Sequence, residues 1–175
     1  SVEIAENPLS NVLRIDYGNF RYYTGGDCPG IADLGQPAWN DVGTAVAKAV
    51  GPVDVAVLDH HGNRDSHNES NVRNLRPRVW IGQTWSADHP GHDVLRRITS
   101  RYLYEEPRDL FATNMMEANK LVIGPLIERS YKSTQGHIVV RVMPGGDEYF
   151  VIILDDSNEQ RLVKAVFGPY QSSKK

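Results

Sequence analysis

Apolar and polar residues alternate with two different periods along the chain, and each period predicts a different kind of element. Residues 11–24 alternate apolar and polar side chains around a Gly-Asn pair, which predicts a hairpin of two antiparallel strands. Residues 38–50 place apolar side chains at helical spacing and stop at Gly51-Pro52, which predicts a helix. A strand at 53–58, a helix at 70–78, a strand at 79–82 and a helix at 89–103 are predicted to follow. Strands that alternate with helices are typical of an α/β fold.

The pattern is weaker beyond residue 105. Residues 106–134 show no sustained period, so we expect an irregular connection there, with one short helical turn near Met115. Three apolar runs then lie at 137–142, 149–154 and 161–167, separated by the turn-forming stretches PGGDE and DDSNE. These runs predict an antiparallel β meander. The predicted fold class is therefore α/β with a C-terminal antiparallel meander.

The composition excludes few classes of protein. A net charge of −3 over 175 residues argues against a protein that coats nucleic acid through bulk positive charge. The sequence contains no apolar run that approaches the roughly 18–20 residues needed to span a bilayer, so we expect no membrane segment. The single cysteine, Cys28, cannot form a disulfide within the chain, and it leaves the cellular compartment open.

Four side chains that can bind a metal ion follow predicted strands. Asp27 comes after the second hairpin strand, His60 and His61 follow the strand at 53–58, and His89 follows the strand at 79–82. Because open α/β sheets place their sites at the carboxyl ends of the strands, these side chains are expected at the same edge. Carboxylate and neutral imidazole are ordinary ligands of divalent metals, and a carboxylate can bridge two of them.

Each of these residues also has a structural interpretation. Asp27 fits a glycine turn, one histidine of the His60-His61 pair can finish a strand in the core while the other is exposed, and His89 can be a polar helix cap. His67 lies in a polar loop and is not expected to carry chemistry. Seven arginines after the histidines fit either a phosphate-bearing substrate or solvated helix faces: Arg64, Arg73, Arg76, Arg78, Arg96, Arg97 and Arg101.

The order of four short stretches resembles a known family. "FRYYTGGD", "DVAVLDHHGN", "RPRVWIG" and "DHPGHDVL" follow one another as corresponding stretches do in the second half of the metallo-β-lactamase fold. The match is closest to the hydrolase domain of ComEC-type competence proteins, and it covers residues 9–103. The resemblance implies that residues 1–105 are the second half of an αββα sandwich. Beyond the match, residues 106–134 would form an irregular connection to a C-terminal β extension at residues 135–170.

The resemblance also implies a site and its metals. Asp27 would be the metal-bridging carboxylate, one histidine of His60 and His61 a metal ligand with the other beside it, and His89 a catalytic residue that lines the substrate pocket. The cofactors of the full-length enzyme would be two divalent metal ions. Zinc is the first candidate for both, and manganese is the alternative. The implied activity is a metal-dependent hydrolysis of small-molecule esters or phosphodiesters, with nucleic acid among the substrates.

One departure from the family changes the expectation for this chain. The histidine-rich "HxHxDH" cluster, which supplies most metal ligands in the family, does not occur in the sequence. We therefore expect a fragment of a hydrolase that is inactive alone and self-associates through its exposed half-domain surface. The alternative is a catalytically inactive relative that acts as a binding or interaction protein. In that case Tyr149, Phe150 and Phe167 of the meander would form a docking surface.

Overall fold

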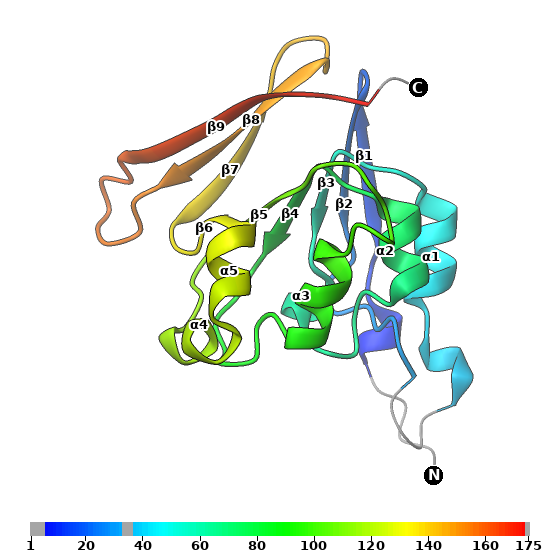
Figure 1. Ribbon diagram of the computed structural model, residues 1–175. Coiled ribbons are helices and arrows are strands. Elements are labelled where there is room, and N and C mark those ends of the chain that lie inside the picture. The colour runs from blue at the N-terminus through cyan, green and yellow to red at the C-terminus, as the bar shows by residue number, and fades with distance from the viewer. Residues whose placement is uncertain (1–5, 33–36, 174–175) are drawn as a thin grey trace.

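A six-stranded sheet forms the centre of the molecule. The computed structural model describes residues 6–32 and 37–173. The strands follow each other in sequence order: β1 (Leu13–Tyr17), β2 (Phe20–Thr24), β3 (Val55–Val57), β4 (Val79–Gly82), β5 (Asp109–Ala112) and β6 (Tyr131–Ser133). β1 and β2 form the predicted antiparallel hairpin, and every later neighbour is parallel. The carboxyl ends of β2 to β5 therefore meet at one edge, which is the lower edge in Figure 1.

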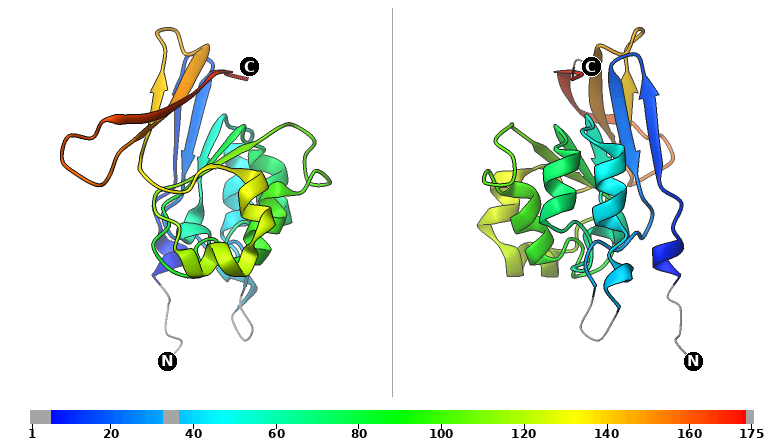
Figure 2. Two further views of the ribbon diagram at one scale, coloured as in Figure 1. Left: turned by 60° about the vertical axis from the view of Figure 1, so that its left-hand side comes forward. Right: turned by 90° about the vertical axis from the view of Figure 1, so that its right-hand side faces the viewer.

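Helices cover one face of this sheet (Figures 1 and 2). They are α1 (Gly43–Val50), α2 (Glu69–Leu75), α3 (His92–Thr99), α4 (Glu117–Ile123) and α5 (Pro125–Ser130), with short 3-10 turns at Asn7–Leu9, Ala38–Asn40 and Asp59–Gly62. Tyr23, Ala56 and Trp80 of the strands share one buried cluster with helix residues such as Leu75 and Leu95. None of the helices in the described residues is long and apolar enough to cross a membrane.

A three-stranded antiparallel sheet packs on the opposite face. It consists of β7 (His137–Val142), β8 (Glu148–Leu154) and β9 (Val163–Gln171). Every second residue of β8 is buried, and Tyr149 and Val151 join Phe20, Val55 and Phe111 in a second buried cluster. Because the large sheet is covered on both faces at its central strands, all residues of β3 and β4 are buried and apolar or small. The structure thus confirms the α/β class and the C-terminal meander.

The region between residues 106 and 134 is not irregular. It contains β5, α4, α5 and β6, so the expectation of an irregular connection was wrong, and the helical turn expected near Met115 lies where α4 begins at Glu117. Each element is only three to seven residues long, and Gly124-Pro125 separates the two helices. The conformation of these runs is set by packing against neighbouring strands and helices, and such contacts leave no pattern in the local sequence.

The aromatic side chains of the meander do not form an exposed surface. Tyr149 is fully buried, and its hydroxyl donates a hydrogen bond to the carbonyl of Asp54 at 3.3 Å. The ring of Phe167 packs edge-on against Phe111 with 5.1 Å between the centroids, and Phe150 is half-buried. The docking surface expected for a binding protein is therefore absent at Tyr149, whose ring belongs to the core between the sheets.

The meander leaves part of the large sheet uncovered. A cleft of about 380 Å³ lies between the two sheets, with apolar walls that include Ile15, Tyr22, Val57 and Val140. All residues of β1 are exposed, and Ile15 at the mouth of this cleft keeps 53% of its surface in contact with solvent. The molecule thus has an apolar face that its own described residues only partly bury.

Two turns that are distant in sequence touch through their backbones. The turn between β1 and β2 meets the turn between β7 and β8, where Gly146 has a φ of +80°. A Cβ atom on Gly146 would lie 2.0 Å from the carbonyl oxygen of Tyr17, and Asn19 donates a hydrogen bond to Asp147 at 2.8 Å. Glycine is needed here for its conformation and for the close approach.

Gly146→Ala is expected to destabilise the protein more than Gly51→Ala. Gly51 has a φ of +69° and a ψ of −167° with nothing within 4 Å, so its replacement should cost about 1–3 kcal/mol through the backbone conformation alone. Gly146→Ala should lower the free energy of unfolding by about 1–3 kcal/mol more, because the carbonyl of Tyr17 has to move. Urea unfolding of both variants measures the difference, and equal losses would contradict the turn contact.

Candidate metal centre

The chain makes a left-handed turn directly after β3. His60 and His61 have φ angles of +47° and +58°, and Gly62 follows with +79°. Residues other than glycine lose about 1–2 kcal/mol each in this conformation. Two such residues in succession persist only where surrounding contacts hold them, and strained backbone of this kind is concentrated at functional sites.

Hydrogen bonds join this turn to two other loops. The amide of His60 donates to the carbonyl of Gly26 at 2.9 Å, in the loop that carries Asp27. The amide of Gly91 donates to the carbonyl of Gly62 at 2.8 Å, in the loop that follows β4. The structure therefore brings together the three loops that follow β2, β3 and β4.

Asp27 and His61 face each other across this edge. The Nε2 atom of His61 lies 3.7 Å from Oδ1 of Asp27, which is too long for a hydrogen bond. The Nδ1 atom of His61 lies 2.8 Å from the carbonyl oxygen of Gln83 and donates a hydrogen bond to it, so Nε2 is the ring atom that is left to bind a metal ion. Two ligands about 2.1 Å from a tetrahedral ion lie about 3.4 Å apart, so the pair fits two positions around one ion.

His60 points to a different partner. Its Nδ1 atom lies 2.8 Å from Oδ1 of Asp65, in the loop before α2. The rings of His60 and His61 are tilted relative to each other, with 6.3 Å between their centroids. Of the two adjacent histidines, His61 is therefore the one that shares a site with Asp27.

His89 lies against the ring of His61. The two rings are stacked with 4.9 Å between centroids, and the indole of Trp85 meets both of them edge-on. His89 is only 5% exposed, and its Nδ1 atom has no hydrogen-bond partner in the described part of the chain. Burial, together with the nearby His61, lowers the pKa of His89, which favours the neutral ring at pH 7.

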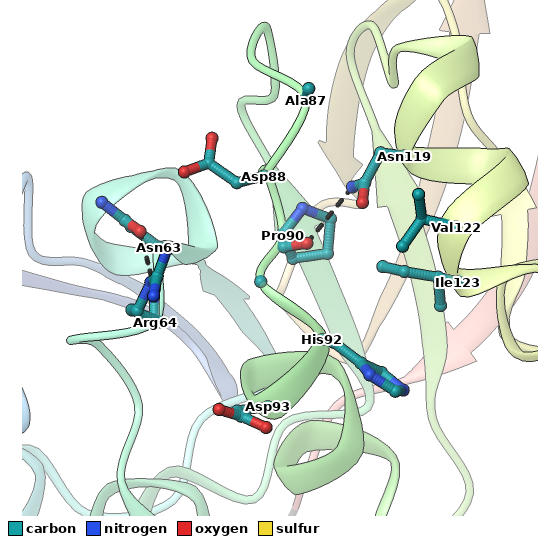
Figure 3. Close-up of a pocket in the computed structure, with 11 residues that line it drawn as sticks. Asn63, Arg64, Ala87, Asp88, Pro90, His92, Asp93, Asn119, Val122 and Ile123 are labelled. Carbon is teal, nitrogen blue, oxygen red and sulfur yellow. Dashed lines mark hydrogen bonds between the residues drawn. The ribbon is translucent and has the colours of Figure 1, made fainter.

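A pocket of about 280 Å³ opens beside these loops (Figure 3). It lies between the loop at Asn63 and Arg64, the start of α3 at His92, and the helix α4. Asn119 of α4 donates a hydrogen bond to the carbonyl of Pro90 at 3.2 Å and thereby joins α4 to the loop after β4. His89 is not among the lining residues, so it is not placed in the wall of this pocket.

Two buried polar residues support the turn. Asp59 is 1% exposed, and its carboxylate accepts a hydrogen bond from the hydroxyl of Tyr23 at 2.8 Å. Burial raises the pKa of Asp59 to about 8, and the hydrogen bonds from Tyr23 and the backbone of Gly25 oppose that rise. The ring of His67 lies on the other side, where its Nε2 atom accepts a hydrogen bond from the amide of Asp59 at 2.7 Å.

His67 is a residue whose place the sequence did not predict. It is fully buried, and burial lowers its pKa to about 4. One local signal was present in the sequence, since Asn68 is the N-cap of α2 and accepts a hydrogen bond from the amide of Asn71. A residue directly before a helix cap lies where the loop meets the helix, but its burial depends on Trp80 and β3, which are distant in sequence.

The arginines after the histidines do not converge on Asp27 and His61. Arg97 donates to the carbonyls of Ser66 and His67, and Arg76 pairs with Glu106. The thiol of Cys28 is buried, and burial raises its pKa to about 12, so it is not a nucleophile at neutral pH.

The pair of Asp27 and His61 is not a complete metal site. Across residues 6–32 and 37–173, no three side chains of His, Cys, Asp or Glu form a group that could hold a metal ion. The donors present fit part of a coordination shell, and further ligands are needed to complete it. No family model and no curated protein matches the chain, so the geometry of the site is the basis for any functional conclusion.

His67 is expected to lower the stability of the protein as the pH decreases from about 6.5 to about 4, while the raised pKa of Asp59 acts in the opposite direction over this range. In this window the unfolded chain protonates His67, whose ordinary pKa is about 6.5, while the folded protein does not, so proton uptake favours unfolding. The slope from this one group is at most about 1.4 kcal/mol per pH unit. His67→Gln should lack it, whereas His137→Gln, at an exposed position, should retain it. Urea unfolding across this pH range measures both slopes, and equal slopes for wild type and His67→Gln would disprove the assignment.

Proposed function

We propose that the chain is part of a metal-dependent hydrolase of esters or phosphodiesters with a metallo-β-lactamase-like site. The observation that carries the proposal is the pairing of Asp27 with the free Nε2 atom of His61 at the end of a strained turn. A carboxylate and an oriented imidazole at the carboxyl edge of a parallel sheet are the arrangement expected of a metal site.

Asp27 and His61 would hold the metal, and zinc or manganese would suit this donor set. Bound divalent ions of this kind lower the pKa of water to near 7 and stabilise the charge that develops during hydrolysis. The residues of this chain contribute orientation. The carbonyl of Gln83 fixes the tautomer of His61, and His89 stacks on the same ring and limits its rotation.

The pocket beside the loops supports a small-molecule ester or phosphodiester as substrate. Its walls combine polar and charged side chains with the apolar side chains of Val122 and Ile123. The charged and imidazole groups are those of Arg64, His92, Asp88 and Asp93, so the mixed charge favours a neutral ester over a phosphodiester. The similarity to competence-type hydrolases adds nucleic acid to the candidate substrates, and this addition is an analogy by family.

The remaining ligands would come from a segment outside residues 6–32 and 37–173. The cleft between the two sheets supports this inference, since a further strand or segment beside Ile15 and Tyr22 would fill it and extend the sandwich that β7 to β9 begin. The same cleft reaches Gln83, whose carbonyl accepts the hydrogen bond from His61. A segment that fills the cleft would therefore end beside the metal ligand.

The metal content of the protein tests the proposal. Elemental analysis is expected to find about two metal ions per chain in the product of the complete reading frame, and much less in the 175-residue chain. Asp27→Asn and His61→Ala should lower the metal content of the complete product and reduce its hydrolysis of bis(p-nitrophenyl) phosphate at least about 100-fold. His92→Ala, which alters the pocket but not the pair, is the matched control and should retain the metal.

The absence of metal from both proteins would refute the hydrolase. That outcome would favour the alternative of an inactive relative that acts as a binding protein. This alternative is supported by one observation, namely that the described residues contain no group of three metal-binding side chains.

The isolated chain is expected to self-associate through the cleft. Ile15→Lys should weaken association at least about tenfold, or about 1.4 kcal/mol, because a charge would have to be buried between apolar walls. Leu162→Lys, on an exposed apolar residue of the segment between β8 and β9, is the control and should leave association unchanged. Sedimentation velocity over a range of concentrations measures the effect. A chain that stays monomeric, or equal association of both variants, would argue against this surface.

A further inference from the structure

The strained turn that carries His60 and His61 is held by a side chain outside the turn. The ring of His67 lies between Asp59, the residue before the two histidines, and Asn71 of α2. His67 has no exposed surface, and it does not contact Asp27 or the substrate pocket. Its position links the helix to the end of β3.

The directions of its two hydrogen bonds require one form of the ring. The amide of Asp59 donates to Nε2 of His67 at 2.7 Å, so this nitrogen carries no proton. Nδ1 then carries the proton and donates to Oδ1 of Asn71, also at 2.7 Å. The amide group of Asn71 is oriented in turn by the hydrogen bond from its nitrogen to the carbonyl of Gly43 at 3.4 Å. The lowered pKa of the buried His67 agrees with a neutral ring.

The ring has no freedom to turn away from Asp59. Its edge packs on the indole of Trp80, with 5.1 Å between the centroids and an interplanar angle of 78°. The guanidinium of Arg97 donates to the carbonyl of His67 at 2.7 Å and fixes the backbone, which is itself left-handed with a φ of +47°. Contacts from α3, β4 and α2 therefore determine where the acceptor for the Asp59 amide lies.

We propose that His67 is a positioning residue for the candidate metal centre. By fixing the amide of Asp59, its ring holds His60 and His61 in the left-handed conformation in which His61 faces Asp27. The inference rests on the proposed function only where metal affinity is concerned. The effect on the conformation of the turn stands without any metal.

The variant His67→Leu distinguishes the hydrogen bond to the amide of Asp59 from simple packing of the side chain. Leucine would fill much of the space but offers no acceptor, so the buried amide of Asp59 would be left without a partner and the turn would relax. Glutamine carries an acceptor and a donor on one amide, and it can replace both hydrogen bonds. Leu75→Ala is the matched control, because Leu75 lies fully buried on α2 and its loss affects stability without touching the turn.

The experiment compares His67→Leu, His67→Gln and Leu75→Ala in the full 175-residue chain by NMR without metal. Strong intraresidue amide-to-Hα contacts at His60 and His61 report a positive φ. They are expected in wild type, His67→Gln and Leu75→Ala, and lost in His67→Leu. Zn²⁺ affinity, measured on the product of the complete reading frame, should fall about 10–100-fold in His67→Leu only.

Two results would overturn the proposal. One is a positive φ at both histidines in His67→Leu, and the other is an equal loss in His67→Leu and Leu75→Ala. If the wild-type protein binds no Zn²⁺, the proposed hydrolase fails, and the NMR comparison then decides the role of His67 alone.

Discussion

The backbone at the end of β3 is buried, and each of its polar groups needs a partner inside the protein. β3 is only three residues long and lies between β2 and β4, so the chain leaves the sheet while it is still covered on both faces. The amide of Asp59 is paired with His67 and that of His60 with the carbonyl of Gly26. An unpaired amide here would cost about 1–3 kcal/mol, a large share of the stability of a small domain. The left-handed turn is the backbone path that satisfies these groups.

That requirement also determines which side chains reach the edge of the sheet. A left-handed turn of two residues directs adjacent side chains to different partners, so His60 pairs with Asp65 while His61 faces Asp27. A regular strand would also separate neighbours, but it would point one of them into the core. The turn instead leaves both rings partly accessible to solvent, with His89 packed behind one of them.

The sequence predicted the elements whose signal is local. The hairpin followed from its Gly-Asn turn, and the meeting of the loops with Asp27 and His61 followed from their positions after parallel strands. β3 and β4 are as short as β5 and β6, but they stand out as apolar runs that are buried throughout. β6 consists of Tyr131, Lys132 and Ser133 and has no such run, and β5, which begins at Asp109, was missed with it. The choice between His60 and His61 depends on the carbonyl of Gln83, and the burial of His67 depends on Trp80. Contacts between segments that are distant in sequence leave no local pattern.

The contact between the first hairpin and the turn after β7 has a kinetic consequence. Tyr17 and Gly146 are far apart in the chain, yet their backbones touch, and β8 reaches across to β2 through Phe20 and Tyr149. The apolar face of β2 to β5 therefore stays open until the last three strands have formed and docked. Non-local contacts of this kind slow folding, because the loop between them must close before they stabilise anything. The face of β2 to β5 that the last three strands cover is therefore the surface through which a newly synthesised chain is most prone to aggregate.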